Sequence, residues 1–299
     1  MKKMRFPLLI VMGVGVIGII LGSFFDFQIS SAIANPKSTI GLLISAIGPT
    51  IGFAAVALMG GGFIAFGLKK EYHIALRVLF FVLAVCCFGV SIFYPAGEYF
   101  GVNGFYGVAP KAVGYAIVLL PEAAAVVGGY FLFRNISNKN MWIVWCIVIG
   151  LLLIALLAII PNVKDYVRRP RYRFLALLEN PRSEFHQWWQ PCRNYKDLMA
   201  QYNIESSDHF KSYPSGHSAE ASILIVAATF YPLADKKFEK YQLPVFLGAC
   251  GVTALVMFAR ILAAAHFLSD VSWGMTIVVT LTFIANEVVM RVKALKVEE

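Results

Sequence analysis

Charged residues are scarce in this sequence of 299 residues. Asp, Glu, Lys and Arg together make up 14% of the chain, against about 25% in soluble domains. Hydrophobic residues make up 59%, and the mean hydropathy is +0.71. This composition excludes a disordered chain, a coiled coil, a conventional soluble enzyme and a typical DNA-binding domain.

Cysteine is sparse as well, and acidic residues are outnumbered. Four of the five cysteines lie inside apolar runs, where they are interpreted as small core residues, and Cys192 stands alone in a polar loop. No disulfide framework is therefore predicted. Lys and Arg number 26 against 17 Asp and Glu, which gives a net charge of +9. A basic excess on an apolar chain indicates loops near anionic lipid and a site for an anionic ligand.

Long apolar runs are what the sequence has in quantity. A membrane-spanning helix needs about 20 mostly apolar residues. Eight stretches qualify, at about 7–25, 40–67, 74–95, 111–133, 141–161, 217–234, 243–264 and 268–290. The first is longer than a signal-peptide core, and Asp26 separates it from the nearest cleavage-like residues, so we expect a retained anchor. The predicted fold is an all-α, polytopic membrane helix bundle of about eight transmembrane helices in the cell (cytoplasmic) membrane.

Lysine and arginine in the short loops orient these spans. With eight spans, the basic groups at both termini and after the second, fourth and sixth spans fall on one side, which predicts that both termini are cytoplasmic. The other side then holds 26–37, 96–110, 162–216 and the turn near 265–268. Segment 162–216 is itself strongly basic after the fifth span, against the usual rule. Binding of an anionic ligand on the extracytoplasmic side explains this exception.

Three clusters of basic and reactive side chains lie on that predicted side. The first, 164–171, contains Lys164, Arg169 and Arg171. Lysine is a compact point charge and arginine a bidentate fork, and both suit phosphate oxygens.

The second cluster is the sequence Pro-Ser-Gly-His before the sixth apolar run. It is typical of a helix start, where free backbone N–H groups favour an anion. Ser215 adds a hydroxyl, Gly216 lets the backbone approach a ligand closely, and His217 can transfer a proton.

The third cluster runs from Arg260 through His266 to Asp270. If this stretch is helical, Asp270 reaches one imidazole nitrogen of His266 and leaves the other free as nucleophile or base. The three clusters lie on separate segments that can converge at one membrane face. Their side chains are short of carboxylates for a two-metal site and fit metal-free phosphoryl transfer through a phosphohistidine.

At these residues the chain resembles the type 2 phosphatidic acid phosphatase superfamily, which is related to the vanadium haloperoxidases. The family pattern is K-x6-R-P, then P-S-G-H, then S-R-x5-H-x3-D. Lys164 and Arg171 match the first motif by spacing, with Tyr172 in place of the proline and Arg169 as a shifted alternative. The second motif matches outright, and the third matches with Ala259 in place of the serine.

The resemblance implies a role for each of these residues. His266 would attack phosphorus, Asp270 would orient it, and His217 would protonate the leaving oxygen. The residues implied to hold the phosphate oxygens are Lys164, Arg171, Ser215, Gly216 and Arg260, with Arg169 as the alternative. No metal and no other cofactor is expected.

The expected function is a metal-independent phosphatase acting on a membrane lipid phosphate or diphosphate. Phosphatidic acid, phosphatidylglycerol phosphate and polyprenyl diphosphate are the candidate substrates, and no nucleic-acid partner is expected. A lipid phosphotransferase with the same site and a non-enzymatic lipid transporter or scaffold remain as alternatives. We expect N-terminal membrane helices over 1–140 and a catalytic membrane core over 141–299 that includes the extracytoplasmic segment 162–216. The oligomeric state is left open.

Overall fold

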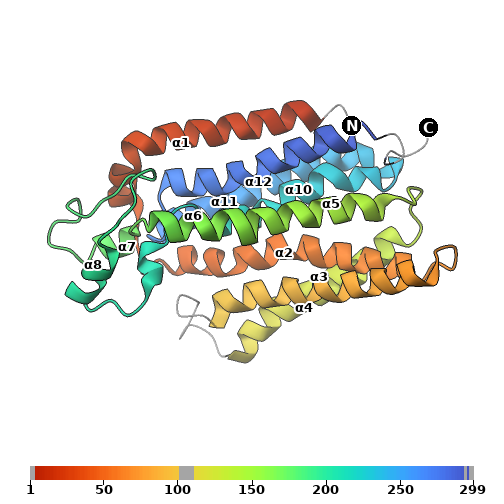
Figure 1. Ribbon diagram of the computed structural model, residues 1–299, viewed down its shortest axis with the longest axis horizontal. Coiled ribbons are helices and arrows are strands. Elements are labelled where there is room, and N and C mark those ends of the chain that lie inside the picture. Colours follow the sequence, from red (N-terminus) through yellow and green to blue (C-terminus); the bar gives the residue numbers. More distant parts are fainter. Residues whose placement is uncertain (1–3, 101–110, 293–294, 296–299) are drawn as a thin grey trace.

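The computed structural model describes residues 4–100, 111–292 and 295, and over these residues the regular structure is entirely helical (Figure 1). The single long helices are α1 (Arg5–Ile33), α2 (Thr39–Gly67), α3 (Ile74–Phe100), α4 (Lys111–Phe133), α11 (Gln242–Leu262) and α12 (Leu268–Val289). Another long rod consists of α5 (Met141–Leu153), a π-helical turn η2 (Ile154–Ile159) and α6 (Ile160–Val167). The short helices are α7 (Tyr172–Leu175), α8 (Tyr195–Gln201), η3 (Ser207–Phe210), α9 (Gly216–Ala221), α10 (Ile223–Phe230), η4 (Tyr231–Leu233) and η5 (Lys236–Tyr241). The all-helical prediction is confirmed.

Seven described helices are long and apolar enough to cross a membrane. They coincide with seven of the eight predicted spans, so the chain is an integral membrane protein. The remaining predicted span, 217–234, corresponds to α9 and α10, which have 6 and 8 residues and meet at Ser222. The eight spans predicted from the sequence and the seven candidate spans among the described residues therefore differ only at this segment.

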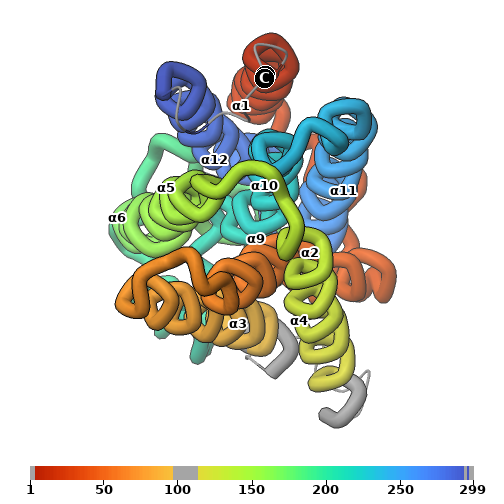
Figure 2. Tube along the Cα trace, turned by 90° about the vertical axis from the view of Figure 1, so that its right-hand side faces the viewer, coloured from red at the N-terminus to blue at the C-terminus, as the bar shows by residue number. Residues whose placement is uncertain are grey.

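The position of α9 and α10 explains why they are short. They lie at the centre of the bundle, enclosed by α2, α5, α11 and α12 (Figure 2). Nearly all their side chains are buried, among them Ile223, Ile225 and Val226. Because protein and not lipid surrounds this segment, it does not need the apolar length of a lipid-facing span.

Helix α1 packs closely along α12 through glycines. A Cβ atom on Gly18 would lie 2.3 Å from the hydroxyl of Ser272, and one on Gly22 would lie 2.6 Å from the backbone nitrogen of Ser269. Only residues without a side chain permit so close an approach between two helices. This contact brings Asp26, one turn beyond Gly22, to the beginning of α12.

Segment 172–213 forms a compact cap at one end of the bundle. Its core contains Phe174, Leu198 and Phe210, which pack against Phe267 at the start of α12. Cys192, predicted to lie in a polar loop, is buried in this core because the loop folds over apolar side chains.

The predicted basic loops and this cap lie at opposite ends of the bundle. Figure 1 shows both chain termini at one end and α7 and α8 at the other. Asn138, after α4, bonds the carbonyl oxygens of Leu233 and Leu295, and Lys139 pairs with Glu71 at 3.1 Å, so three loops and the chain end meet at the terminal end. Two parts of the predicted topology lie outside the described residues. They are 101–110 on the predicted extracytoplasmic side and the basic Lys2, Lys3, Lys293 and Lys296 at the predicted cytoplasmic termini.

The charge pattern of the loops predicts which end faces the cytoplasm. A cysteine introduced at exposed Lys196 on α8 should react with an impermeant maleimide in intact cells, in a cysteine-free background. Lys240→Cys, exposed in η5 at the opposite end, is the matched control and should react only after the membrane is permeabilised. The reverse labelling pattern would contradict the predicted orientation.

Candidate functional site

The three sequence clusters meet at the capped end of the bundle. A Cβ atom on Gly216 would lie 3.4 Å from the Lys164 ammonium, which brings the end of α6 against the start of α9. The backbone N–H of Ser215 donates to the carbonyl oxygen of Asp270 at 3.0 Å. Gly274, one turn later on α12, permits this contact because a Cβ atom there would lie 2.2 Å from the Ser215 carbonyl oxygen. The sequence prediction that these segments converge is therefore confirmed geometrically.

His266 lies at the centre of this site and is only 1% exposed. Its Nδ1 is 2.5 Å from the backbone carbonyl oxygen of Ser212. A carbonyl oxygen only accepts, so Nδ1 carries the proton and Nε2 holds the lone pair. Nε2 has no hydrogen-bond partner among the described residues. The imidazole is thus fixed with its nucleophilic nitrogen available.

The expected direct hydrogen bond from His266 to Asp270 is not formed. His266 Nδ1 lies 3.9 Å from Asp270 Oδ2, beyond hydrogen-bond distance. The physical reason is that α12 begins only at Leu268 and Phe267 before it is extended, with φ of −95° and ψ of 169°, so His266 is not in the same helix as Asp270.

Asp270 reaches His266 indirectly through Ser212. Its Oδ2 accepts a 2.5 Å hydrogen bond from the Ser212 hydroxyl and a 2.9 Å bond from the Phe267 backbone N–H. The same Ser212 offers its backbone carbonyl to His266. Asp270 therefore holds the residue that sets the orientation of the imidazole.

Burial and surrounding positive charge favour the neutral form of His266. Burial is the largest cause, and the charges of Arg171, Arg260 and Lys164 add to it, followed by His217. Together they lower the pKa of His266 well below the usual value of 6.5. A neutral imidazole is the form that can act as a nucleophile.

His217 occupies the first turn of α9 and is 6% exposed. Ser215 caps this helix, since its hydroxyl accepts hydrogen bonds from Ser218 N at 3.3 Å and from Ser218 Oγ at 3.0 Å. The charge of His217 is among those that influence His266, so the two rings share one environment.

Arg171 is held in place by a carboxylate that the sequence motifs do not include. Its Nη2 lies 2.8 Å from Asp208 Oδ1, and its Nε donates to the Asp208 carbonyl oxygen at 2.7 Å. Arg173 contacts the other carboxylate oxygen at 2.6 Å. Burial opposes ionisation of Asp208, but the two guanidinium groups prevail and lower its pKa. Arg171 is thereby fixed as a rigid fork beside His266.

Arg169, the alternative phosphate ligand of the sequence analysis, lies behind Asp270. It is fully buried, and its Nη1 is 2.5 Å from Asp270 Oδ1 while its Nη2 is 2.9 Å from Asp26 Oδ2. The Arg171 position, predicted from motif spacing, is the one whose charge bears on His266.

Asp26, Asp208 and Ser212 are the residues that sequence reasoning missed. Asp208 and Ser212 carry no recognisable motif, since ordinary polar residues of this kind are common in loops. Asp26 did carry a signal, because a lone carboxylate at the end of an apolar membrane run is costly without a function.

A polar cavity of about 210 Å³ lies beside the site, lined by Lys164, Gly216 and Glu220. It shares Tyr94 and Leu156 with an apolar cavity of about 230 Å³ between α3 and the rod of α5 and η2. The polar cavity beside Lys164 therefore adjoins the apolar cavity between the membrane helices at these two side chains.

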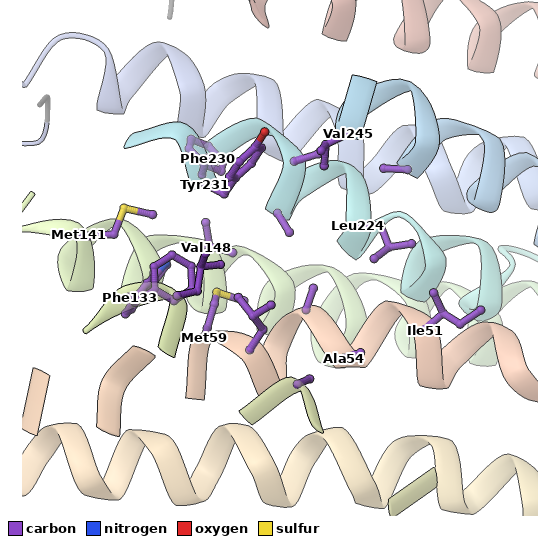
Figure 3. A pocket seen from close by; sticks show the side chains of 18 of the residues that line it. Ile51, Ala54, Met59, Phe133, Met141, Val148, Leu224, Phe230, Tyr231 and Val245 are labelled. Atoms are coloured by element: carbon purple, nitrogen blue, oxygen red, sulfur yellow. The ribbon is translucent and has the colours of Figure 1, made fainter. Parts of the chain in front are cut away.

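A separate cavity of about 540 Å³ lies between α2, α4, α5, α10 and α11 (Figure 3). Apolar side chains such as Met59, Phe133 and Leu224 line it, and the Tyr231 hydroxyl is a polar group at its edge. With no acid–base pair or cation in its lining, this cavity is not the candidate site.

Comparison with known proteins supports the sequence resemblance. The PAP2 superfamily matches the chain over residues 141–293. No curated protein and no solved structure matches. The matched range holds the three motifs, whereas Asp26 lies outside it. Among the described residues, no group of three or more His, Cys, Asp or Glu side chains is placed to hold a metal ion.

Proposed function

Because this chain belongs to the PAP2 superfamily, we propose that it is a membrane phosphatase that hydrolyses a lipid phosphate or diphosphate through a phosphohistidine. The PAP2 superfamily consists mostly of phosphatases, and this chain is an integral membrane member. One observation carries the finer proposal. His266 is buried and neutral, its Nδ1 is held by Ser212, and its Nε2 is left for attack.

The proposed first step forms an Nε2–phosphorus bond at His266 and breaks the bond from phosphorus to the lipid oxygen. His217 donates its proton to that leaving oxygen, which departs as the lipid alcohol or monophosphate. Lys164, Arg171 and Arg260 supply positive charge for the three equatorial oxygens, together with the Ser215 hydroxyl and the Gly216 N–H. Positioning and electrostatic stabilisation of this kind supply most of the catalysis in phosphoryl transfer.

In the second step water attacks the phosphohistidine. His217 accepts a proton from this water, the nitrogen–phosphorus bond breaks, and inorganic phosphate leaves. His266 returns to its neutral form with the lone pair on Nε2. Transfer to a lipid alcohol in place of water would follow the same course and is an outcome that product analysis distinguishes.

The paired cavities support a lipid as substrate. A phosphate beside Lys164 and Gly216 would leave an acyl or prenyl chain to lie along Tyr94 and Leu156 between α3 and the π-helical rod. The N-terminal helices within 1–140 would then serve the catalytic core of 141–299 as part of its substrate path. We place the site on the extracytoplasmic side, in accord with the charge of the loops.

A substrate panel tests the proposed function. Purified protein with EDTA present should release phosphate from at least one of phosphatidic acid, phosphatidylglycerol phosphate and polyprenyl diphosphate. His266→Ala should reduce release by about 10³-fold or more while the protein remains folded, because the site offers no substitute nucleophile. Thin-layer analysis of the lipid product separates hydrolysis from transfer to another lipid. No release from any of the three classes would favour the transporter or scaffold alternative.

The lowered pKa of His266 sets the pH dependence. Protonation of His266 blocks attack, and since its pKa lies below 6.5, kcat/KM should hold its plateau below pH 6.5 and fall only at lower pH. A pH profile of kcat/KM on a soluble nitrophenyl phosphate measures this limb. In His217→Ala the acidic limb should move to slightly higher pH, because the smallest of the charges that lower the pKa of His266 is removed. Activity should be retained better on nitrophenyl phosphate than on a lipid monoester, because a nitrophenolate leaves without a proton. An acidic limb above pH 7 would show that another group controls it.

A further inference from the structure

Asp26 joins the first membrane helix to the site from outside the matched family range. Its side chain is fully buried, although it lies on α1 in a largely apolar sequence. Its Oδ1 accepts a 2.9 Å hydrogen bond from the backbone N–H of Ser269, and its Oδ2 accepts the Ser269 hydroxyl. The carboxylate therefore occupies the first turn of α12, where backbone N–H groups attract negative charge.

Arg169 connects Asp26 to the catalytic carboxylate. One guanidinium nitrogen contacts Asp26 at 2.9 Å, and the other contacts Asp270 at 2.5 Å and the Ser269 hydroxyl at 2.9 Å. Its Nε donates to the His186 carbonyl oxygen at 2.8 Å, and its planar group lies 4.3 Å from the centre of the Phe267 ring. Every side of the guanidinium is thus occupied, and Arg169 has a single position.

That position decides where the Asp270 carboxylate points. With Oδ1 taken by Arg169, Oδ2 is turned toward the Ser212 hydroxyl and the Phe267 backbone. Ser212 then presents its carbonyl oxygen to His266 Nδ1. A continuous series of short contacts leads from Asp26 through Arg169, Asp270 and Ser212 to the proposed nucleophile.

The charges along this series also favour the reaction. Arg169 alone would neutralise an ionised Asp270, whereas two ionised carboxylates around one guanidinium would leave a net negative charge behind the imidazole. The imidazole becomes cationic when Nε2 is phosphorylated and Nδ1 keeps its proton. A net negative group behind the ring stabilises that cation relative to the neutral ground state.

We propose that Asp26 is a positioning residue for His266, acting through Arg169 and Asp270. This inference rests on the proposed role of His266 as nucleophile. It makes α1 part of the catalytic apparatus and not only a membrane anchor. In this proposal Arg169 aligns Asp270 and does not bind phosphate, the alternative role considered for it from the sequence.

The test compares Asp26→Asn with Ser30→Ala in the full-length protein. Asn keeps the size of the side chain and removes its charge, so kcat and the single-turnover rate of phosphoenzyme formation should fall about 10- to 100-fold, as for partners one shell behind a reacting group. KM should change by less than about threefold, since Asp26 does not touch the phosphate. Ser30 lies one turn further along α1 and is equally buried, so Ser30→Ala is a matched change at a buried polar position of the same helix and should keep at least half of wild-type kcat.

Ser269→Ala provides a second variant in case Asp26→Asn does not fold, as judged by gel filtration and thermal unfolding in detergent. It keeps both charges and their direct contact but removes the hydroxyl that bonds both Asp26 and Arg169, and kcat should fall by about threefold or more with KM unchanged. A folded Asp26→Asn protein with wild-type kcat would overturn the inference, as would wild-type kcat in Ser269→Ala if Asp26→Asn is unfolded. Loss in Ser30→Ala equal to that in Asp26→Asn would reduce the role of Asp26 to helix packing. A wild-type protein inactive on the whole lipid panel would overturn the proposed function, and the positioning role with it.

Discussion

A buried guanidinium between two buried carboxylates holds the catalytic end of this bundle together. Arg169 bonds Asp26 on α1, Asp270 on α12 and the backbone of His186 in the cap, so one side chain joins three separate parts of the chain. Removing one partner of a buried ion pair typically costs about 3–5 kcal/mol, because the other charge is left without compensation. The close contact of α1 with α12 at Gly22 makes the arrangement possible, since it brings Asp26 to the first turn of α12.

The site is consequently divided by charge. Behind His266 lies the ion-paired group of Asp26, Arg169 and Asp270, and in front lie cations that lower the pKa of the imidazole. In the proposed mechanism, the cations would bind the phosphate and keep His266 neutral before attack. The ion-paired group behind would compensate the charge that the ring acquires on phosphorylation. Both effects are strong because the site is shielded from water.

The sequence identifies the candidate residues of this site, but it does not predict the contacts among them. The spans follow from apolar length, and Lys164, Ser215, His217 and His266 could be picked out because their spacing is unusual for membrane segments. The segment 217–234 was expected to be one more span, and its division into α9 and α10 depends on burial at the bundle centre, which apolar length does not reveal.

Three contacts depend on tertiary structure and were beyond sequence reasoning. The extended Phe267, just before α12 begins, removes the helical spacing on which a direct bond from Asp270 to His266 was expected, and the Ser212 carbonyl oxygen contacts His266 instead. Tertiary structure favours Arg171 over Arg169 as the proposed phosphate ligand, because the charge of Arg171 acts on His266 whereas Arg169 is enclosed by carboxylates. Asp26 and Arg169 pair across 143 positions of sequence, and no local pattern encodes that pairing.

The central claim is that His266, held by this buried network, forms a covalent bond to phosphorus. The most direct measurement is a rapid SDS quench at alkaline pH of wild-type protein turning over a ³²P-labelled lipid phosphate, followed by peptide mapping. The account predicts label on the peptide that contains His266, stable to base, lost in acid and absent from His266→Ala. Label on another residue, or turnover without any labelled protein under conditions that trap a phosphohistidine standard, would contradict it.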